Sequence, residues 1–496
     1  MPLLRPLQLL LSLPEGAARA LWKAALWGRA FASATPAAAA PAAHREADTS
    51  FDVIVVGGGI AGSCTAYELQ KRGLRVALLE QHDFLHRRGS RCAARVTRRG
   101  LFWSQAWLRN AKTLHGQRAD TGRLCDSHGD SRIIRRTYPQ AHLTEGMAHA
   151  YALWDSAQRE FGGSVFTRTG GLDFGRKGSA ALQSLVAASE LHAVQVARLT
   201  SDEVEQRFPG FRIPSDHEAL YHAEAGVLNA TKACAMFQEL ARRRGALLVD
   251  RTRVLSITPE DTGVRVETSS SSLRAAKVVV AAGAWAPKVL LGMGVDVLGA
   301  LNAVPVAVSY WRCKDDVSAQ QLAAERCPVA IGYTGAGLGT HAALDEQPGA
   351  ECYVLPVLEL PGLVKVSLHL PERLWGPALV DADVRDLTPP HAIVREHVTP
   401  FISRHMPGVD VASGPVLVES CMYTMTPDHE FVMDVVDDKG RVFICSACSG
   451  HGFKFAPLVG ACMADLAESG TSTRLGDMRR FALSRLLRAK DQRAKL

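Results

Sequence analysis

Short apolar runs alternate with amphipathic segments along most of this chain. The first apolar run, residues 51–56 (FDVIVV), suits a strand that is buried on both faces of a parallel sheet. Helix-like spacing follows over residues 65–72, and a second short strand is expected over residues 74–79. The order strand, helix, strand predicts a βαβ unit and therefore a domain of the α/β class.

The same two patterns recur after residue 140. We expect helices at residues 144–161, 180–191, 201–207 and 232–244 and again after Phe455. We expect strands at residues 170–174, 246–249, 254–258, 264–268, 277–285 and 441–445. Residues 301–420 are richer in alternating strand patterns, as in a sheet that covers a substrate cavity.

A glycine-rich turn joins the first predicted strand to its helix. Gly57, Gly59 and Gly62 form a G-x-G-x-x-G motif. The first glycine permits the tight turn, the second lets the backbone approach a pyrophosphate, and the third lets helix and strand pack closely. The second strand ends in Glu80, 23 positions after Gly57, where a carboxylate can accept hydrogen bonds from ribose hydroxyls. An acid rather than an arginine here disfavours NADP, and the whole unit predicts a bound dinucleotide.

Composition changes this picture little. The 496 residues can form two domains with sizeable cores, and no apolar run reaches the roughly 18 residues that would span a membrane. The 11 cysteines have no repeating spacing, which argues against a disulfide framework. Cys445 and Cys448 form a C-x-x-C, which we interpret as packing at a strand end because no thioredoxin-like context precedes it. We expect no metal site.

The net charge of +7 arises in two segments. Residues 1–44 contribute +3, and residues 84–119 contain nine basic residues and no acid, so the rest of the chain carries −5. No stripe of basic and aromatic residues indicates binding to nucleic acid. The basic balance is therefore not a property of the predicted catalytic body.

Both ends of the chain resemble targeting segments. Residues 1–50 are rich in Ala, Leu, Pro and Arg, like a transit peptide, and a disordered extension is the alternative. The final tripeptide, Ala494, Lys495 and Leu496, looks like a variant of the S-K-L signal that the peroxisomal import receptor reads. We favour the peroxisome, which suits an oxidase that makes peroxide, and keep the mitochondrion as the alternative.

Four further motifs carry the candidate chemistry. They are SHGDSRIIR at residues 127–135, PGLVKVSLHL at 361–370, ESCMYTMTPD at 419–428 and SGHGFKF at 449–455. With the glycine-rich turn they resemble the monomeric sarcosine oxidase family, above all its animal branch of peroxisomal sarcosine and L-pipecolate oxidases. The resemblance covers residues 51–90 and 127–496. It implies a Rossmann-like FAD-binding domain of the glutathione-reductase or D-amino-acid-oxidase type, with a mixed-sheet substrate-binding domain.

The two implied domains alternate along the chain. The FAD-binding domain is expected to take residues 51–165, 236–300 and 421–490. The substrate-binding domain is expected to take residues 166–235 and 301–420, and residues 491–496 form the targeting tail. Residues 91–126 interrupt the first segment without helix or strand periodicity. We interpret them as a low-order loop or a gene-model artefact, although their arginines could also suggest an anionic partner.

The resemblance implies a role toward the flavin for each matching residue. Cys421 matches the cysteine that forms a thioether to the flavin 8α-methyl group, although a lone cysteine is more often a packing residue. His128 and Arg132 would lie against the ring, where Arg132 helps to hold the negative charge of the reduced flavin. Further cofactor contacts are expected at Val254, Gly283, Gly450 and Gly452.

The resemblance also implies an amino-acid pocket. Arg135 and Lys454 match the pair that binds the substrate carboxylate, one as a planar fork and the other as a point charge. Tyr353 and Tyr423 are expected to line the substrate cage. An acid that bacterial members carry five residues after the arginine is Gln140 here, so their substrate preference does not transfer directly.

Two basic side chains are expected on one strand face near the flavin. Lys365 and His369 are four residues apart in an alternating run, so they would share that face with Ser367. Lys365 matches the family's oxygen-activating lysine, whose fixed ammonium group stabilises developing superoxide. His369 would orient the substrate amine.

These roles predict a monomeric oxidase that converts sarcosine or L-pipecolate to an imine and O2 to H2O2. Two alternatives stay open. A mitochondrial dehydrogenase of the same fold would pass electrons to a protein, which the N-terminal segment favours and Lys365 disfavours. A non-catalytic flavin-bearing assembly protein would not need the carboxylate-binding pair. Sarcosine and L-pipecolate are not ranked, because cavity volume decides between them.

Overall fold

The structure is a computed structural model that describes residues 50–84, 131–333, 351–369, 382–383, 391–446 and 448–487. Three sheets organise these residues, two of eight strands and one of three. The segment 1–49, the insertion 91–126, His128 and the C-terminal tripeptide lie outside the described residues. The predictions made for them therefore stay predictions.

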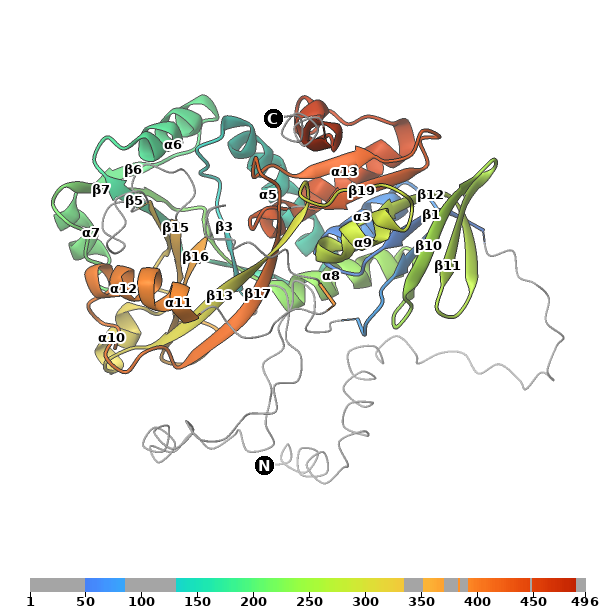
Figure 1. Ribbon diagram of the computed structural model, residues 1–496. Coiled ribbons are helices and arrows are strands. Elements are labelled where there is room, and N and C mark those ends of the chain that lie inside the picture. The colour runs from blue at the N-terminus through green and yellow to red at the C-terminus, as the bar shows by residue number, and fades with distance from the viewer. Residues whose placement is uncertain are drawn as a thin grey trace, which may run out of the picture. The chain divides into compact units, whose positions relative to one another are not determined.

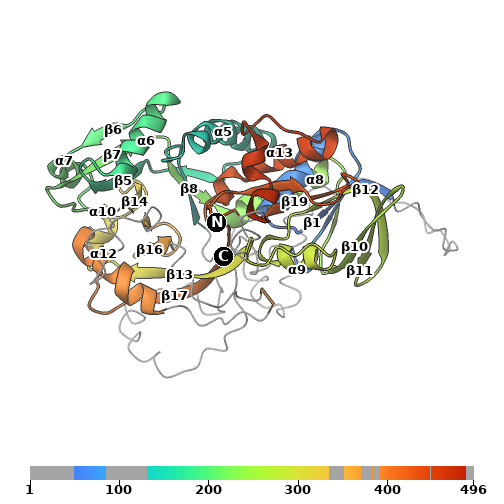
Figure 2. The same cartoon turned by 45° about the horizontal axis from the view of Figure 1, so that its top comes forward.

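The first sheet contains the predicted βαβ unit at its centre (Figure 1). Its parallel strands are, in spatial order, β9 (Leu247–Val249), β2 (Val76–Leu79), β1 (Ser50–Val56), β12 (Ser272–Val280) and β19 (Val442–Ser446). Antiparallel strands extend it as β10 (Val254–Glu260), β11 (Gly263–Thr268) and β18 (Val432–Val435). The hairpin β10–β11 lies at the edge far from β5 and β7 in both views (Figures 1 and 2).

Both faces of this sheet are buried, as the apolar run of β1 predicts. Val53 and Val55 pack into one core cluster and Ile54 and Val56 into another. The first cluster includes residues of the helices α3 (Ile60–Lys71), α5 (Ala141–Phe161), α8 (Ala230–Arg243) and α13 (Ala456–Ser469). The second includes β11 and α9 (Ala286–Leu291). Because side chains alternate along a strand, one apolar run supplies both cores.

The second sheet is mostly antiparallel. Its strands are, in spatial order, β17 (Leu417–Met425), β13 (Asn302–Arg312), β16 (Leu363–His369), β15 (Glu351–Leu355), β14 (Val329–Tyr333), β5 (Gly171–Arg176), β7 (His217–His222) and β6 (Ala197–Leu199). A third core cluster contains side chains of this sheet and of the helix α12 (Thr399–His405). The small sheet consists of β3 (Ser131–Ile134), β8 (Gly226–Asn229) and β4 (Phe166–Arg168).

The long strands β13 and β17 run from the second sheet toward the first (Figures 1 and 2). The end of β17 meets the turn after β19, where the Ser449 amide donates to the Thr424 carbonyl at 3.0 Å. β17 crosses the predicted domain boundary at Cys421 as one strand of the second sheet. We therefore propose that this boundary follows Met425.

Several predicted elements match closely and others shift. α6 (Ala180–Leu191) and α7 (Ser201–Arg207) have the predicted bounds. α3 begins at Ile60, earlier than predicted, because the glycine turn leads directly into the helix. The strand predicted at 277–285 is wrong at both ends: β12 spans Ser272–Val280, and the 3₁₀ turn η3 (Gly283–Trp285) follows it. Within the described part of the chain, no helix combines the length and apolarity needed to cross a bilayer.

Candidate functional site

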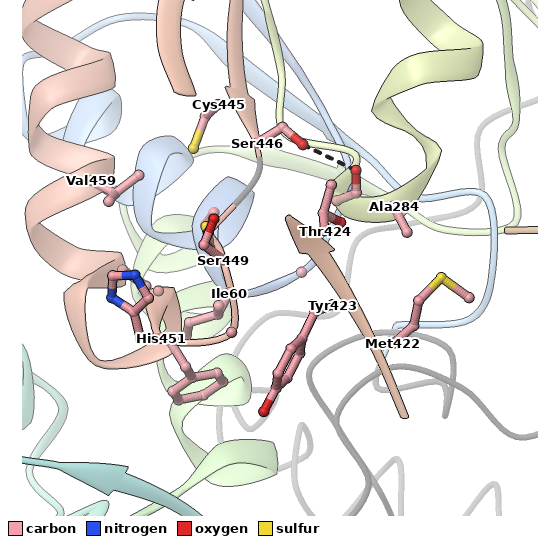
Figure 3. A pocket seen from close by; sticks show the side chains of 18 of the residues that line it. Ile60, Ala284, Met422, Tyr423, Thr424, Cys445, Ser446, Ser449, His451 and Val459 are labelled. Carbon is pink, nitrogen blue, oxygen red and sulfur yellow. Dashed lines mark hydrogen bonds between the residues drawn. The ribbon is translucent and has the colours of Figure 1, made fainter. Parts of the chain in front are cut away.

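A cavity of about 1130 Å³ is lined by strand ends of the first sheet and by one face of the second. Figure 3 looks between the end of β17, with Met422, Tyr423 and Thr424, and the turn with Ser449 and His451. The Ser446 hydroxyl donates to the Gly283 carbonyl at 3.2 Å, the bond dashed in that view.

The glycine-rich turn forms one end of the cavity. Gly57 has a φ of +111°, and a Cβ atom there would lie 2.4 Å from the carbonyl oxygen of Ala281. A Cβ atom on Gly62 would lie 1.9 Å from the carbonyl oxygen of Gly57, so α3 can pack this closely only with glycine. Gly59 lines the cavity and has open space where a Cβ would point. The turn therefore leaves room for a pyrophosphate beside the start of α3.

Glu80 lies buried at the end of β2 and lines the same end of the cavity. Its Oε2 accepts a hydrogen bond from the Gly58 amide at 2.8 Å, and its Oε1 accepts one from the His82 amide at 2.9 Å. These bonds fix the orientation of the carboxylate at the cavity wall. Val254 and Gly283 line this cavity too.

One face of β15 and β16 forms part of the opposite wall. Lys365 and His369 line the cavity, whereas Val366 and Leu368 between them pack into the core. Across the strand pair, Leu355 lies opposite Lys365, and Tyr353 lies opposite Ser367. Ser367 points its hydroxyl to the Ala307 carbonyl. The alternation of the sequence thus brings Lys365 and His369 to one surface.

The Lys365 ammonium group is buried and held in place. Its Nζ donates to Ser131 Oγ at 3.2 Å and to Glu359 Oε1 at 3.3 Å. Glu359 accepts a further bond from the Tyr310 hydroxyl at 2.7 Å. Burial lowers the pKa of Lys365, and Glu359 opposes that shift. The site therefore holds one oriented cation with a paired acid that sequence reasoning did not identify.

Arg135 follows β3 and contacts an acid on the second sheet. Its Nη1 donates to Asp173 Oδ1 at 2.8 Å and to the Tyr333 hydroxyl at 2.7 Å. Thr137 Oγ1 also donates to Asp173, at 2.6 Å, and His222 Nε2 lies 3.2 Å away. Burial raises the pKa of Asp173, but Arg135, His222 and Thr137 together lower it more, so the net shift is downward. Asp173 thus stays ionised beside the guanidinium.

The ion pair changes what Arg135 can offer a substrate. Nη1 is taken by protein partners, Nε has no hydrogen-bond partner among the described residues, and Nη2 lies 4.0 Å from Glu351. Arg135 lines the cavity. The predicted two-bond contact between Arg135 and a substrate carboxylate therefore has to use Nε and Nη2.

Lys454 lies in η7 (Gly452–Phe455), close to Arg135. Its Nζ donates to the Tyr138 hydroxyl at 2.8 Å. The Tyr138 ring centroid lies 5.4 Å from Lys454 Nζ and 4.7 Å from Arg135 Cζ, so one aromatic ring contacts both cations. Burial, with Arg135 nearby, lowers the pKa of Lys454 to about 7. The predicted cation pair is thus brought together in the fold.

Cys421 and Tyr423 lie two positions apart on β17, and both line the cavity. Cys421 is buried, lies opposite Val306 of β13, and lines the cavity. Tyr423 shares a hydrogen bond with Tyr353, so the two predicted cage tyrosines meet. Cys421 forms no disulfide within the described part of the chain, and its side chain lies at the cavity wall.

His369 packs against the same cage. Its ring lies 5.7 Å from that of Tyr423, and burial lowers its pKa to about 3, so the imidazole is neutral. Gly450 lets the neighbouring turn approach both rings: its φ is +75°, and a Cβ there would lie 2.7 Å from Tyr423 and 2.8 Å from His369. Gly452 is needed for contact with Cys448, whose Cβ would lie 2.1 Å from an added Cβ.

The predicted residue Arg132 also lies at the cavity, whereas several polar residues of the site were not predicted. Arg132 lines the cavity, with its guanidinium 5.6 Å from the Phe453 ring and Nη1 donating to Ser131 at 2.5 Å. The residues that sequence reasoning missed are buried or partly buried polar groups around the two cation sites: Tyr138, Asp173, Tyr333, Glu351 and Glu359. Asp173 left a signal, because a single acid within an apolar strand usually has a charged partner.

Comparisons with known proteins agree with this geometry. A family model described as FAD dependent oxidoreductase matches residues 52–466. "Probable sarcosine oxidase" of Arabidopsis thaliana is 33% identical, covering 88% of this chain and 93% of that protein. "Peroxisomal sarcosine oxidase" of Homo sapiens is 31% identical, covering 88% and 96%. "Monomeric sarcosine oxidase" of Bacillus sp. is 28% identical over the same shares.

Solved structures share the fold at lower identity. NikD, described as an unusual amino acid oxidase essential for nikkomycin biosynthesis, is 23% identical with a TM-score of 0.66, covering 87% of this chain and 97% of that one. L-proline dehydrogenase from P. horikoshii is 19% identical with a TM-score of 0.66, covering 89% and 99%. The predicted α/β fold and the predicted family resemblance are confirmed.

Proposed function

Because this chain belongs to the sarcosine oxidase family of FAD-dependent oxidoreductases, we propose that it oxidises a small amino acid with a secondary amine and passes the electrons to O2. The amino acid loses two electrons and two protons and becomes an imine. O2 gains the same two electrons and two protons and becomes H2O2. Sarcosine and L-pipecolate are the candidate substrates.

The residues of the cavity fit the cofactor that the family requires. The backbone at Gly57 and Gly59 would receive the pyrophosphate, Gly62 lets α3 pack closely behind them, and Glu80 would accept hydrogen bonds from the ribose. When bound, FAD supplies the two-electron acceptor that no protein side chain provides. The open space at Gly59 supports this assignment. No described residue packs where its Cβ atom would point, so a glycine is required there only if a bound group approaches the backbone closely.

The observation that carries the substrate proposal is the meeting of Arg135 and Lys454 over Tyr138 at the cavity wall. Two buried cations that line one cavity suit a carboxylate. Neutral His369 can accept a hydrogen bond from an amine without repelling it, and Tyr353 and Tyr423 complete the enclosure. A carboxylate and an amine close together define an amino acid.

Peroxide release tests this function. Purified protein should form one H2O2 per amino acid consumed in air with sarcosine or L-pipecolate, and much less with glycine, which has a primary amine. The measurement is a peroxidase-coupled assay together with an oxygen electrode. Reduction of an artificial electron acceptor without O2 consumption would support the dehydrogenase alternative. Absence of both activities would support a non-catalytic flavin protein.

We further propose that Cys421 Sγ is joined to the flavin 8α-methyl carbon. Its burial at the cavity wall, outside any disulfide among the described residues, supports this. Bond formation removes one hydrogen from the thiol and one from the methyl group, with two electrons that O2 takes up as H2O2. Such a bond would prevent loss of the cofactor and raise its reduction potential.

Acid precipitation checks the covalent bond. The wild-type pellet should stay yellow, whereas the Cys421→Ser pellet should be colourless, with all flavin in the supernatant. Cys448→Ser is the matched control, because Cys448 also lines the cavity, and its pellet should stay yellow. A colourless wild-type pellet would exclude the thioether.

We propose a peroxisomal location for the protein. Relatives from Homo sapiens and Mus musculus that are named peroxisomal sarcosine oxidase support it, at 31% identity each. The chemistry supports it as well, because peroxisomes contain the enzymes that remove H2O2.

A further inference from the structure

Glu351 is an acid in the cavity wall that the proposed reaction does not yet use. It begins β15, lies directly opposite His369 of β16, and lines the cavity with Tyr353. Its side chain is 20% exposed, and its Oε2 lies 4.0 Å from Arg135 Nη2. Among the described residues, no hydrogen-bond donor reaches its carboxylate.

Before substrate binds, the charges around Glu351 balance when Glu351 is ionised and Lys454 is protonated. Asp173 is bonded to Arg135, which leaves Lys454 and Glu351 as a second pair of opposite charges. The titratable and charged groups that face Glu351 are Arg135 and Tyr138 after β3, Asp173 of β5, Tyr333 of β14, His369 of β16 and Lys454 of η7. An incoming carboxylate alone would add a third negative charge, which a buried site disfavours.

An amino acid zwitterion brings the proton that restores this balance. Its ammonium nitrogen is bonded to the carbon that bears the carboxylate, so a substrate held by Arg135 and Lys454 brings that nitrogen near Glu351. We propose that Glu351 accepts the proton from the substrate ammonium group. The N–H bond breaks, an O–H bond forms on Glu351, and the electron pair stays on nitrogen. The inference rests on the proposed function.

The transfer has two consequences for the site. Glu351 becomes neutral, so Arg135 and Lys454 then face two carboxylates, those of Asp173 and the substrate. The amine becomes neutral, and its electron pair can form the imine bond when the neighbouring carbon is oxidised. Burial raises the pKa of Glu351 more than Arg135 lowers it, which suits a carboxylate that has to hold a proton.

Neighbouring groups are poorer proton acceptors. His369 has its pKa lowered to about 3 by burial. Asp173 already accepts bonds from Arg135 and Thr137, and Glu359 accepts bonds from Lys365 and Tyr310. Glu351 therefore combines position beside the cations with an oxygen that is available for a proton.

Glu351→Gln tests the transfer by the pH profile of anaerobic substrate oxidation. In the variant the ammonium proton has to leave for solvent, so the inflection should move up by at least one pH unit. The rate at pH 7 should fall about tenfold or more and recover at high pH. Binding of propanoate, which has no amine, should change in the opposite direction and become tighter at pH 7, because the repelling acid is gone. Glu205→Gln, at an exposed acid paired with Arg212, should match wild type in both measurements.

Each contrary result has a separate meaning. An unchanged profile in Glu351→Gln, an equal fall at every pH, or weaker propanoate binding overturns the role of Glu351 and leaves the oxidase function standing. A wild-type protein that oxidises no secondary-amine amino acid overturns the function itself. If Glu351→Gln does not fold, Glu351→Asp decides, because its carboxylate should keep the inflection near the wild-type value while the rate falls. The proposal would also be overturned if the inflection of Glu351→Asp rose to the pKa of the free amine.

Discussion

Replacing Lys365 with methionine is expected to slow the reaction of the reduced enzyme with O2 by roughly 100- to 1000-fold. Lys365 Nζ is fixed by Ser131 and Glu359 at the cavity wall, so its positive charge does not have to reorient as O2 becomes negatively charged. Methionine has a similar length and is tolerated in cores, so the packing of β16 should survive. Reduction of the enzyme by substrate should change only a few-fold.

Stopped-flow mixing separates these two half-reactions. The enzyme is first reduced by substrate without air and then mixed with O2, and each rate is followed by flavin absorbance. Lys177→Met, at an exposed lysine bonded to the Ser215 carbonyl, serves as the control and should match wild type. Equal slowing of both half-reactions would reject the oxygen role. Burial lowers the pKa of Lys365. In wild type the rate of reoxidation should therefore fall as pH rises, at a pH below the usual pKa of lysine. The Lys365→Met variant should not show this fall.

Local patterns predicted the elements of this fold well where the hydrophobic period was strong. The run of β1 and the helices α6 and α7 were found because burial on fixed faces leaves a period in the sequence. The start of α3 and the limits of β12 were missed. There a glycine turn and long-range strand pairing, rather than local periodicity, decide where an element begins or ends.

The amino-acid pocket was predicted in its cations and missed in its acids. Arg135, Lys365 and Lys454 belong to contiguous motifs, so a resemblance could identify them. Asp173 and Glu351 lie on strands of the second sheet, far along the chain from Arg135, and only the pairing of those strands brings them to it. Residue spacing carries no information about such contacts, and that is why the charge balance of the pocket emerged only from the structure.

Arg135→Met is expected to destabilise the protein by about 3 to 5 kcal/mol and to lower kcat/KM at least about 100-fold. The stability loss follows because Asp173 would remain buried without its guanidinium partner at 2.8 Å. The catalytic loss follows because Lys454 alone would hold the substrate carboxylate. Urea unfolding and steady-state kinetics measure the two effects. Arg136→Met is the matched control, because Arg136 pairs with the half-exposed Glu224 and should contribute less than about 1 kcal/mol.

A second change separates the two roles of Arg135. Asp173→Asn, added to Arg135→Met, should restore much of the stability, because no buried charge is then left unpaired, but it should not restore kcat/KM. The pH dependence has a defined sign. In wild type the lowered pKa of Asp173 gives stability that is present above its unfolded value and is lost as pH falls through the folded value. In Arg135→Met the pKa of Asp173 should rise, because only His222 and Thr137 then oppose the effect of burial, and protonation relieves the penalty. The stability difference between wild type and Arg135→Met should therefore shrink as pH falls from 7 toward 4, and a constant difference would show that Asp173 is not its cause.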